Sequence, residues 1–347
     1  MNTPKFSIIM PCYNSEDYVC SAIKSIMNQS YQNWELVIVN DGSYDKTLNI
    51  INDYAQKDDR IKVFSKENGG YATAVNYGLN NIRGDYFLFL GSDDRLSEDL
   101  FEKIVEQIDT LDTFPDMIAF RTRLVVDGVV GEIEKLTKFS AVAYNECKIK
   151  EFIEKDRVNS AIFSIRDTSR CYSRKILGDT RYFGKTGMDA DGIFSMLICH
   201  KAHSFLNVPV DGYFWTLRSN SVSASSSINK LIDRISNWHE FFEIISKYYA
   251  NDITETEKQY LGITSNYIVN LCKNPKNAMK HRKFVKNEAK FINGIARYFN
   301  AKVNHNLSFI AKSPVVFSII QWVKKRCWRP LVHIVTGDLK KTRNSGK

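Results

Sequence analysis

One eight-residue stretch, FLFLGSDD at residues 87–94, places the tightest limit on what this chain can fold into. Four large apolar residues in a row are typical of a strand that is buried on both faces. The run ends in Gly91, Ser92 and two adjacent aspartates, Asp93 and Asp94. Two carboxylates at the tip of a buried strand are costly unless a cation offsets their charge, and hard divalent cations prefer carboxylate oxygens. The stretch therefore predicts a site for a metal and an anionic ligand, the alternative being a polar turn in which one aspartate caps the next helix.

The residues before this stretch alternate between short apolar runs and amphipathic segments. Apolar runs lie at residues 6–10, 34–39, 61–64 and 86–90, and the segments between them carry apolar residues at helical spacing. Strands that alternate with helices of this length form βαβ units. We therefore predict an α/β fold with a parallel sheet.

Polar residues and glycines follow each predicted strand. They are YN at 13–14, DGSYD at 41–45, NGG at 68–70 and SDD at 92–94. The carboxyl ends of parallel strands share one edge of the sheet, where open α/β sheets bind their ligands. Neither a GxGxxG motif after the first strand nor a GxxxxGK[ST] motif occurs in the chain. The pattern predicts a nucleotide-type crevice without a Rossmann fingerprint or a P-loop.

Four ordered motifs within residues 6–100 resemble the start of a family-2 glycosyltransferase. They are SIIMPCYN at 7–14, LVIVNDGSYD at 36–45, NGG at 68–70 with Ala74, Asn76 and Gly78 after it, and GDY at 84–86 leading to the acid pair. The resemblance implies a GT-A fold, a doubly wound, mainly parallel sheet flanked by helices. It also implies a bacterial surface-polysaccharide enzyme that binds a nucleotide-diphosphate sugar and inverts the anomeric centre in one displacement.

The resemblance assigns roles to donor-site residues by motif. Tyr13 would pack on or near the base, usually uracil, and Asp41 would hydrogen-bond the uracil ring while Asp45 steadies that loop. The alternatives are a core aromatic for Tyr13 and a plain turn at Asp41. The expected nucleotide-binding set is Pro11, Tyr13, Asn14, Asp41, Asp45, Asn68, Gly69, Asp93 and Arg218.

The acid pair departs from the family pattern at one position. Asp93 and Asp94 match the family's acidic pair, of which one residue would meet the ribose or donor sugar. The other would hold Mn²⁺ or Mg²⁺ on the diphosphate. Many members carry an additional aspartate where Gly91 stands. Both aspartates are therefore expected metal residues, and the choice of ligand between them stays open.

A general base is expected at the start of a helix near residue 191. The segment GMDADGIF at 187–194 resembles the family's pattern of Glu-Asp, two residues and an aromatic. Asp191 matches the aspartate, which would remove the proton of the acceptor hydroxyl as that oxygen attacks the anomeric carbon. Ala190 stands where glutamate is common, and Asp189 is the runner-up for the base. The alternative is that Asp191 only places a charge at a helix N-terminus.

The segment YFWTLRSNSVS at 213–223 resembles the end of the family's catalytic domain. Arg218 would help to neutralise the departing diphosphate, since a guanidinium suits phosphate, and the alternative is a surface arginine without a role. Three local features predict element boundaries. Ser15 and Ser97 each look like the N-cap of the helix that follows, and Pro209 predicts an edge strand at 205–210.

From residue 226 the pattern becomes helical. We predict a catalytic domain at 1–225, with a nucleotide-sugar half at about 1–100 and an acceptor half at about 101–225, and a helical, basic region at 226–347. An apolar helix with a tryptophan at 315–323 precedes a run of basic residues, which suits the plane of an anionic membrane surface. The alternative is a helix packed on the domain with a solvated basic tail.

Composition bounds the partners and the compartment. The net charge of +9 favours anionic partners, although nothing beyond the basic tail indicates nucleic acid, so none is expected. Seven cysteines without CxxC pairs argue for a reducing compartment. With neither a signal peptide nor an apolar stretch of roughly 20 residues, the expected location is cytoplasmic, at the inner face of the cell membrane.

Together these patterns predict an inverting, metal-dependent glycosyltransferase. It would move a sugar from a UDP-sugar to a hydroxyl of a surface glycan such as capsule, exopolysaccharide or teichoic acid, in lipid-linked form if the tail docks at a membrane. One alternative is a nucleotidyltransferase, which would show a glycine-rich signature with a lysine or arginine near the first strand, unlike PCYN at 11–14. Another is a nucleotide-sugar-binding protein or membrane scaffold without turnover, which Gly91 and Ala190 keep open.

Overall fold

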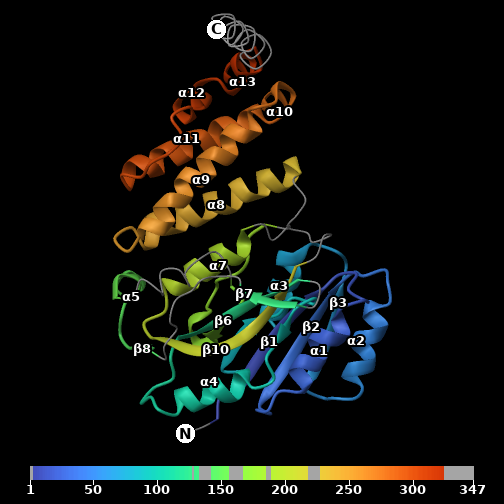
Figure 1. Ribbon diagram of the computed structural model, residues 1–347. Coiled ribbons are helices and arrows are strands. Elements are labelled where there is room, and N and C mark those ends of the chain that lie inside the picture. The colour runs from blue at the N-terminus through green and yellow to red at the C-terminus, as the bar shows by residue number, and fades with distance from the viewer. Residues whose placement is uncertain are drawn as a thin grey trace, which may run out of the picture. The chain divides into compact units, whose positions relative to one another are not determined.

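The structure is a computed structural model that describes residues 3–126, 129–132, 142–155, 167–184, 189–217 and 227–323. Figure 1 shows the order of the elements along the chain. The chain divides into two compact units, Met1–Ser226 and Ser227–Lys347. Arg218 and the basic stretch after residue 323 lie outside the described residues.

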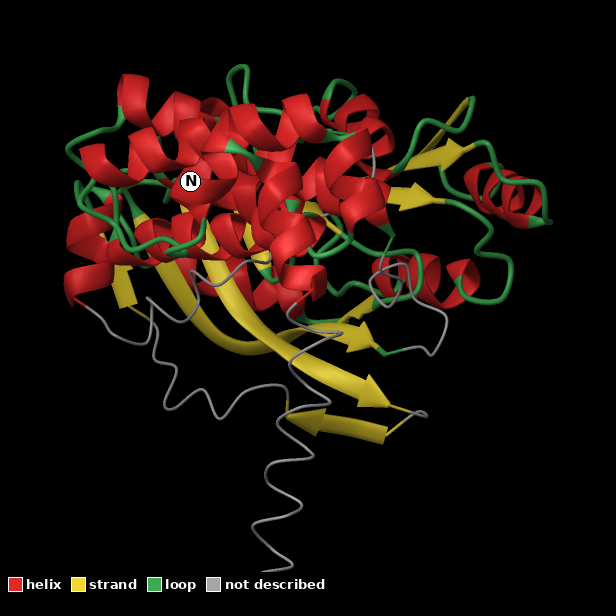
Figure 2. Cartoon of the chain, turned by 90° about the horizontal axis from the view of Figure 1, so that it is seen from above, coloured by secondary structure: helices red, strands yellow, loops and turns green. Residues whose placement is uncertain are grey.

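The first unit is built on one mixed sheet. Its parallel part has the order β3-β2-β1-β4 and consists of β1 (Phe6–Cys12), β2 (Trp34–Asp41), β3 (Ile61–Lys66) and β4 (Tyr86–Phe89). The order continues through β9 (Arg170–Ser173), β6 (Met117–Val126), β10 (Phe205–Thr216) and β5 (Arg95–Leu96), while β7 (Val129–Glu132) pairs with β6 and β8 (Val142–Tyr144) with β10. The strands twist strongly across the unit (Figure 2). Because β1 lies between β2 and β4, the strand order reverses there, and ligands bind outside such a switch point.

Helices cover both faces of this sheet. One face packs against α1 (Val19–Met27), α2 (Thr47–Ala55) and α4 (Leu100–Ile108). The other packs against α3 (Tyr71–Leu79), α5 (Ile149–Lys155) and α7 (Ala190–Cys199), and the short turn η1 (Arg174–Ile176) follows β9. In β1, Ile8 and Met10 join the first core and Ile9 joins the second, as the period of two along a strand requires. Burial on both faces explains the unbroken apolar runs and confirms the predicted doubly wound α/β architecture.

Two helices begin later than their serines predicted, so both N-cap predictions are wrong. The first helix begins at Val19, because the Ser15 hydroxyl instead lies 2.8 Å from the hydroxyl of Ser92 in the loop after β4. The fourth helix begins at Leu100, after Asp99 at the cap position. The Ser97 hydroxyl is buried without a hydrogen-bond partner among the described residues. Neither serine hydroxyl therefore caps the helix that follows it.

The prediction of an edge strand at 205–210 is also wrong. β10 runs from Phe205 to Thr216 and has neighbours on both sides, with β6 parallel to it and β5 and β8 antiparallel. Its register with β6 shifts between Asn207 and Asp211, around Pro209. A bulge is how an interior strand accommodates a proline, which has no amide hydrogen to donate.

The described elements of the second unit are all helices, which confirms the predicted helical C-terminal region. They are α8 (Ile228–Tyr248), α9 (Glu255–Leu271), α10 (Pro275–Lys280), α11 (Arg282–Tyr298), α12 (Leu307–Lys312) and α13 (Pro314–Val323). A capping box between Thr254 and Glu257 starts α9. Trp238 stacks on Tyr260 with ring centroids 4.3 Å apart and joins α8 to α9. Across the described part of the chain, every helix is too short or too polar to cross a membrane.

Candidate active site

The loops after β1 and β2 are hydrogen-bonded to each other. The Asn14 amide donates to the Ser43 hydroxyl at 3.0 Å, and the Tyr44 amide donates to the side-chain carbonyl of Asn14 at 3.1 Å. Asn14 has a φ of 48°, a left-handed conformation that asparagine tolerates better than most residues. The YN and DGSYD motifs therefore form one continuous wall at the edge of the sheet.

Asp45 ties the same two loops with its carboxylate. Its Oδ2 accepts from the amide of Glu16 at 3.1 Å, and its Oδ1 accepts from the amide of Thr47 at 2.9 Å. Burial acts to raise the pKa of Asp45, but the hydrogen bonds from Thr47 and Glu16 outweigh it and lower the pKa below its ordinary value. The carboxylate is therefore ionised at neutral pH and holds the wall in place.

Asp41, at the end of β2, organises the loop after β3. The carboxylate is buried, and its Oδ1 accepts from the ammonium of Lys66 at 2.6 Å and from the amide of Gly69 at 3.0 Å. Its Oδ2 accepts from the amide of Gly70 at 2.9 Å. The side-chain amide of Asn68 donates to the Asp41 carbonyl at 2.9 Å. The NGG motif after β3 therefore forms a loop that is folded around the carboxylate of Asp41 at the end of β2.

Two exposed aromatic rings stand at this wall. Tyr13 is 48% exposed and Tyr44 is 84% exposed, and their rings meet edge to face with centroids 6.1 Å apart. Pro11, by contrast, is buried at the end of β1. The alternative of a core aromatic at Tyr13 is therefore excluded, and the ring is available to a planar ligand.

The acid pair follows β4 as predicted, but the two carboxylates are used differently. Asp94 is 5% exposed, and its Oδ2 accepts from the hydroxyl of Tyr213 at 2.6 Å while its Oδ1 accepts from the amide of Thr216 at 2.8 Å. Asp93 is only partly buried. The alternative in which an aspartate caps the next helix is wrong, because the strand β5 comes directly after Asp94.

Tyr71, at the start of α3, marks where the acid pair and the predicted base come together. Burial raises the pKa of Tyr71 well above its ordinary value, and the charges of Asp167, Asp191, Asp94 and Asp93 raise it further. The charges that act on Tyr71 therefore come from both predicted acidic sites, the pair after β4 and the first turn of α7.

A buried polar cluster lies behind Asp191, which sits in the first turn of α7. Arg170 is 2% exposed and donates to the Ser195 hydroxyl at 2.5 Å. Asp167 is 1% exposed, and burial together with the charge of Asp191 raises its pKa well above its ordinary value. The buried carboxyl of Asp167 is therefore harder to ionise than an ordinary aspartate, because the charge of Asp191 lies near it.

The donor set fits a cation that is shared with a phosphate ligand. Among the described residues, no group of three or more His, Cys, Asp or Glu side chains could hold a metal ion by itself. Mg²⁺ is usually held by one or two carboxylates together with substrate phosphates, so such a group is not required. Both oxygens of Asp94 accept hydrogen bonds from the protein, and Asp93 is the more exposed of the two carboxylates.

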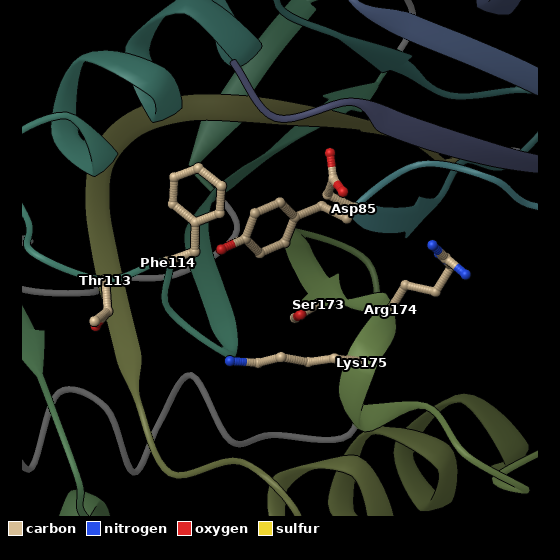
Figure 3. A pocket seen from close by; sticks show the side chains of 7 residues that line it. Asp85, Thr113, Phe114, Ser173, Arg174 and Lys175 are labelled. Carbon is tan, nitrogen blue, oxygen red and sulfur yellow. The ribbon is translucent and has the colours of Figure 1, made fainter. Parts of the chain in front are cut away.

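An open pocket of about 510 Å³, seen from close by in Figure 3, shares no lining residue with this site. Its lining includes Asp85 and Tyr86, at the amino end of β4. Its cations have partners, since the ammonium of Lys175 lies 2.7 Å from Asp116 and Nε of Arg174 donates to the Gly84 carbonyl at 2.7 Å. The pocket is therefore separate from the candidate active site.

The sequence profile described as Glycosyl transferase family 2 matches residues 7–181, about half of the chain. The chain belongs to this family. A crystal structure of TarS 1–349 from S. aureus, in complex with UDP-GlcNAc, has a TM-score of 0.68 to this family-2 chain at 21% sequence identity. The similarity covers 93% of this chain and 92% of that one, and it confirms the predicted GT-A fold.

Two relatives extend the comparison. The minor teichoic acid biosynthesis protein GgaB of Bacillus subtilis is 31% identical over 279 residues, which make up 76% of this chain and 28% of that protein. An uncharacterized glycosyltransferase of Haemophilus influenzae is 51% identical over 104 residues, or 30% of this chain and 42% of that protein. This family-2 chain therefore spans less than half the length of either relative.

The sequence motifs located the carboxylates and loops of the site but missed three residues that organise it. The sequence offered only a weak indication of Tyr213, which is the first residue of the aromatic run after Gly212. Tyr71 directly follows the NGG motif, whereas nothing in the pattern around Lys66 marked it. Arg218, predicted to act on the diphosphate, lies outside the described residues.

We expect Asp45→Asn to lower the melting temperature at pH 7. The folded pKa of Asp45 is lowered, so its stabilisation is present above the ordinary carboxyl pKa of about 3.9 and is lost as the pH falls through the folded pKa. The gap between wild type and variant should therefore narrow as the pH falls below about 4. Thermal denaturation across this pH range checks it, with exposed Asp59→Asn as the control. A gap that does not depend on pH would contradict the assignment.

Proposed function

We propose that this chain is an inverting glycosyltransferase that moves a sugar from a UDP-sugar to a hydroxyl of a bacterial surface polymer. The observation that carries the proposal is that hydrogen bonds join the loops after all four parallel strands, with the acid pair Asp93 and Asp94 in the last of them. The TarS structure with UDP-GlcNAc supports a UDP-sugar donor. The name of GgaB, a minor teichoic acid biosynthesis protein, supports teichoic acid or a similar polymer as the acceptor.

The donor base binds at the wall formed by the first two loops. The exposed rings of Tyr13 and Tyr44 offer aromatic faces for stacking on uracil. Oδ2 of Asp41 accepts one hydrogen bond, from the amide of Gly70, and a carboxylate oxygen has room for a second, which a uracil N–H supplies. Asn14 and Asn68 hold these loops in register and so shape the same face.

The diphosphate binds beside the acid pair with a divalent cation, Mn²⁺ or Mg²⁺, held by Asp93. Such an ion, when bound, stabilises the negative charge that develops on the leaving diphosphate. Asp94 holds the loop at 91–94 in place, because its carboxylate accepts hydrogen bonds from Tyr213 and Thr216 of β10. Arg218, two residues after Thr216 in the sequence, is the further cation proposed for the diphosphate.

Asp191 acts as the general base in a single displacement. The acceptor oxygen forms its bond to the anomeric carbon while the bond from that carbon to the diphosphate oxygen breaks, and UDP leaves with the electron pair. Asp191 takes the proton of the acceptor hydroxyl. Attack opposite to the leaving group inverts the anomeric centre.

We further propose that the C-terminal region holds the enzyme at the inner, cytoplasmic face of the cell membrane. On α13, Val316 and Ile319 are each 47% exposed and Ile320 is 39% exposed. The sequence that follows is basic from Lys324 to Arg329. Exposed apolar residues beside lysine and arginine suit an anionic lipid surface.

The donor and the metal can be tested together by thermal denaturation. Protein is mixed with UDP, GDP, CDP or dTDP, each with Mn²⁺, Mg²⁺ or EDTA. A ligand at about 100 times its dissociation constant adds roughly 2.7 kcal/mol, which is readily detected. We expect a shift with UDP that depends on the divalent cation and is lost in Asp93→Ala. A shift with another nucleotide would assign a different donor nucleotide. The absence of a shift with all four nucleotides would contradict the proposed donor site.

We expect Asp191→Asn to lower kcat by about 10²–10⁴-fold while UDP affinity stays unchanged, because the base acts only on the acceptor proton. Release of UDP from UDP-sugars in the presence of polymer acceptors measures turnover. Asp189→Asn is the matched control, since Asp189 has a φ of 60° that asparagine also tolerates.

Loss of turnover in Asp189→Asn alone would transfer the role of base to that residue. A wild type that binds UDP but releases none from any donor would favour the binding protein or scaffold without turnover. Release of pyrophosphate would favour a nucleotidyltransferase.

Membrane association can be tested by vesicle flotation. The wild type should float with vesicles of phosphatidylglycerol and not with phosphatidylcholine alone, and high salt should weaken the interaction because it screens the charges. The triple variant Val316→Ser, Ile319→Ser, Ile320→Ser should float less. Equal flotation with both lipids, or unchanged flotation of the variant, would contradict the proposal.

A further inference from the structure

Asp94 and Gly91, which flank Asp93 in the loop after β4, are hydrogen-bonded to β10, a strand that does not pair with β4 in the sheet. We infer that Tyr213 is a positioning residue that sets the carboxylates of Asp93 and Asp94 for the metal and the donor, and that it can do so because residue 91 is glycine. The inference rests on the proposed metal–diphosphate site and adds to it how that site is assembled in this chain.

The first part of the evidence is the hydrogen-bond network around Tyr213. The side chain is 1% exposed, and its hydroxyl accepts from the amide of Gly91 at 3.1 Å while it donates to Oδ2 of Asp94 at 2.6 Å. From the same strand, the amide of Thr216 donates to Oδ1 of Asp94 at 2.8 Å. Hydrogen bonds to an ionised acceptor are shorter and stronger than neutral ones. Both ends of the loop at 91–94 are therefore fixed by β10.

The second part is the space above Gly91. A Cβ atom there would lie 2.5 Å from Oδ2 of Asp94 and 2.9 Å from Oδ1 of Asp93, closer than real Cβ atoms come to their neighbours. The two carboxylates thus occupy the volume that a side chain at position 91 would need. An aspartate at this position, as many family members have, would displace both carboxylates instead of adding a ligand to them.

The test compares Tyr213→Phe with Tyr86→Phe. Tyr86 is also 1% exposed, and its hydroxyl donates to the Pro115 carbonyl at 2.6 Å at the other edge of the sheet. Each variant loses a buried hydrogen bond of 2.6 Å that its hydroxyl donates, and Tyr213→Phe also loses the bond that its hydroxyl accepts from Gly91. UDP binding is measured by titration calorimetry with Mn²⁺ and with EDTA.

We expect Tyr213→Phe to reduce the Mn²⁺-dependent gain in UDP affinity by about tenfold or more, as the loss of a hydrogen bond to a charged group implies. Its UDP affinity in EDTA should stay within about twofold of wild type, because a twofold change in affinity is a small change in binding free energy. Tyr86→Phe should keep the full Mn²⁺ response. A full response in Tyr213→Phe would overturn the inference alone, whereas no response in the wild type would overturn the proposed metal site and the inference with it.

A second pair of variants keeps the test valid if Tyr213→Phe does not fold. Gly91→Ala and Gly91→Asp should both lose the Mn²⁺ response, although the second adds a carboxylate. Gly294→Ala on α11 is the control, since nothing lies within 4 Å of a Cβ there. A gain of Mn²⁺-dependent UDP affinity in Gly91→Asp would overturn the inference.

Discussion

Buried carboxylates at the ends of parallel strands hold the donor side of this protein together. Asp41 and Asp94 each accept hydrogen bonds from segments far away in the sequence, and Asp45 joins the first two loops. A carboxylate taken out of water needs several donors, so each one draws loop amides and side chains towards it. These carboxylates therefore hold the loops at the end of the parallel strands in one conformation through hydrogen bonds.

The aspartates of this site fall into two kinds, which differ in burial and in the hydrogen bonds that the protein supplies to them. Asp41 and Asp94 are buried, and the protein supplies donors to both oxygens of each. Asp93 and Asp191 are more exposed. Removal of Asp41 or Asp94 would therefore loosen the loops whose amides these buried carboxylates accept from.

The sequence predicted the features that depend on local pattern. Unbroken apolar runs gave the buried strands, and the motifs after them located the carboxylates. What it did not predict depends on partners distant in the chain. Ser15 was expected to cap a helix but meets Ser92, and Pro209 was expected at an edge but lies in a bulge of an interior strand. Sequence periodicity predicts that a residue is buried but does not predict which segment packs against it. The contact between Tyr213 and Asp94 could therefore not be predicted.

The link between Gly91 and Tyr213 limits how this domain can be divided. The family profile ends at residue 181, whereas the strand that fixes the acid pair runs to Thr216. A chimera joined between these points would combine a donor half from one parent with a supporting strand from another. If that parent carries a side chain at position 91, its partner strand will have adapted to a different shape. Recombination within this family should therefore succeed more often when both segments come from the same ancestor.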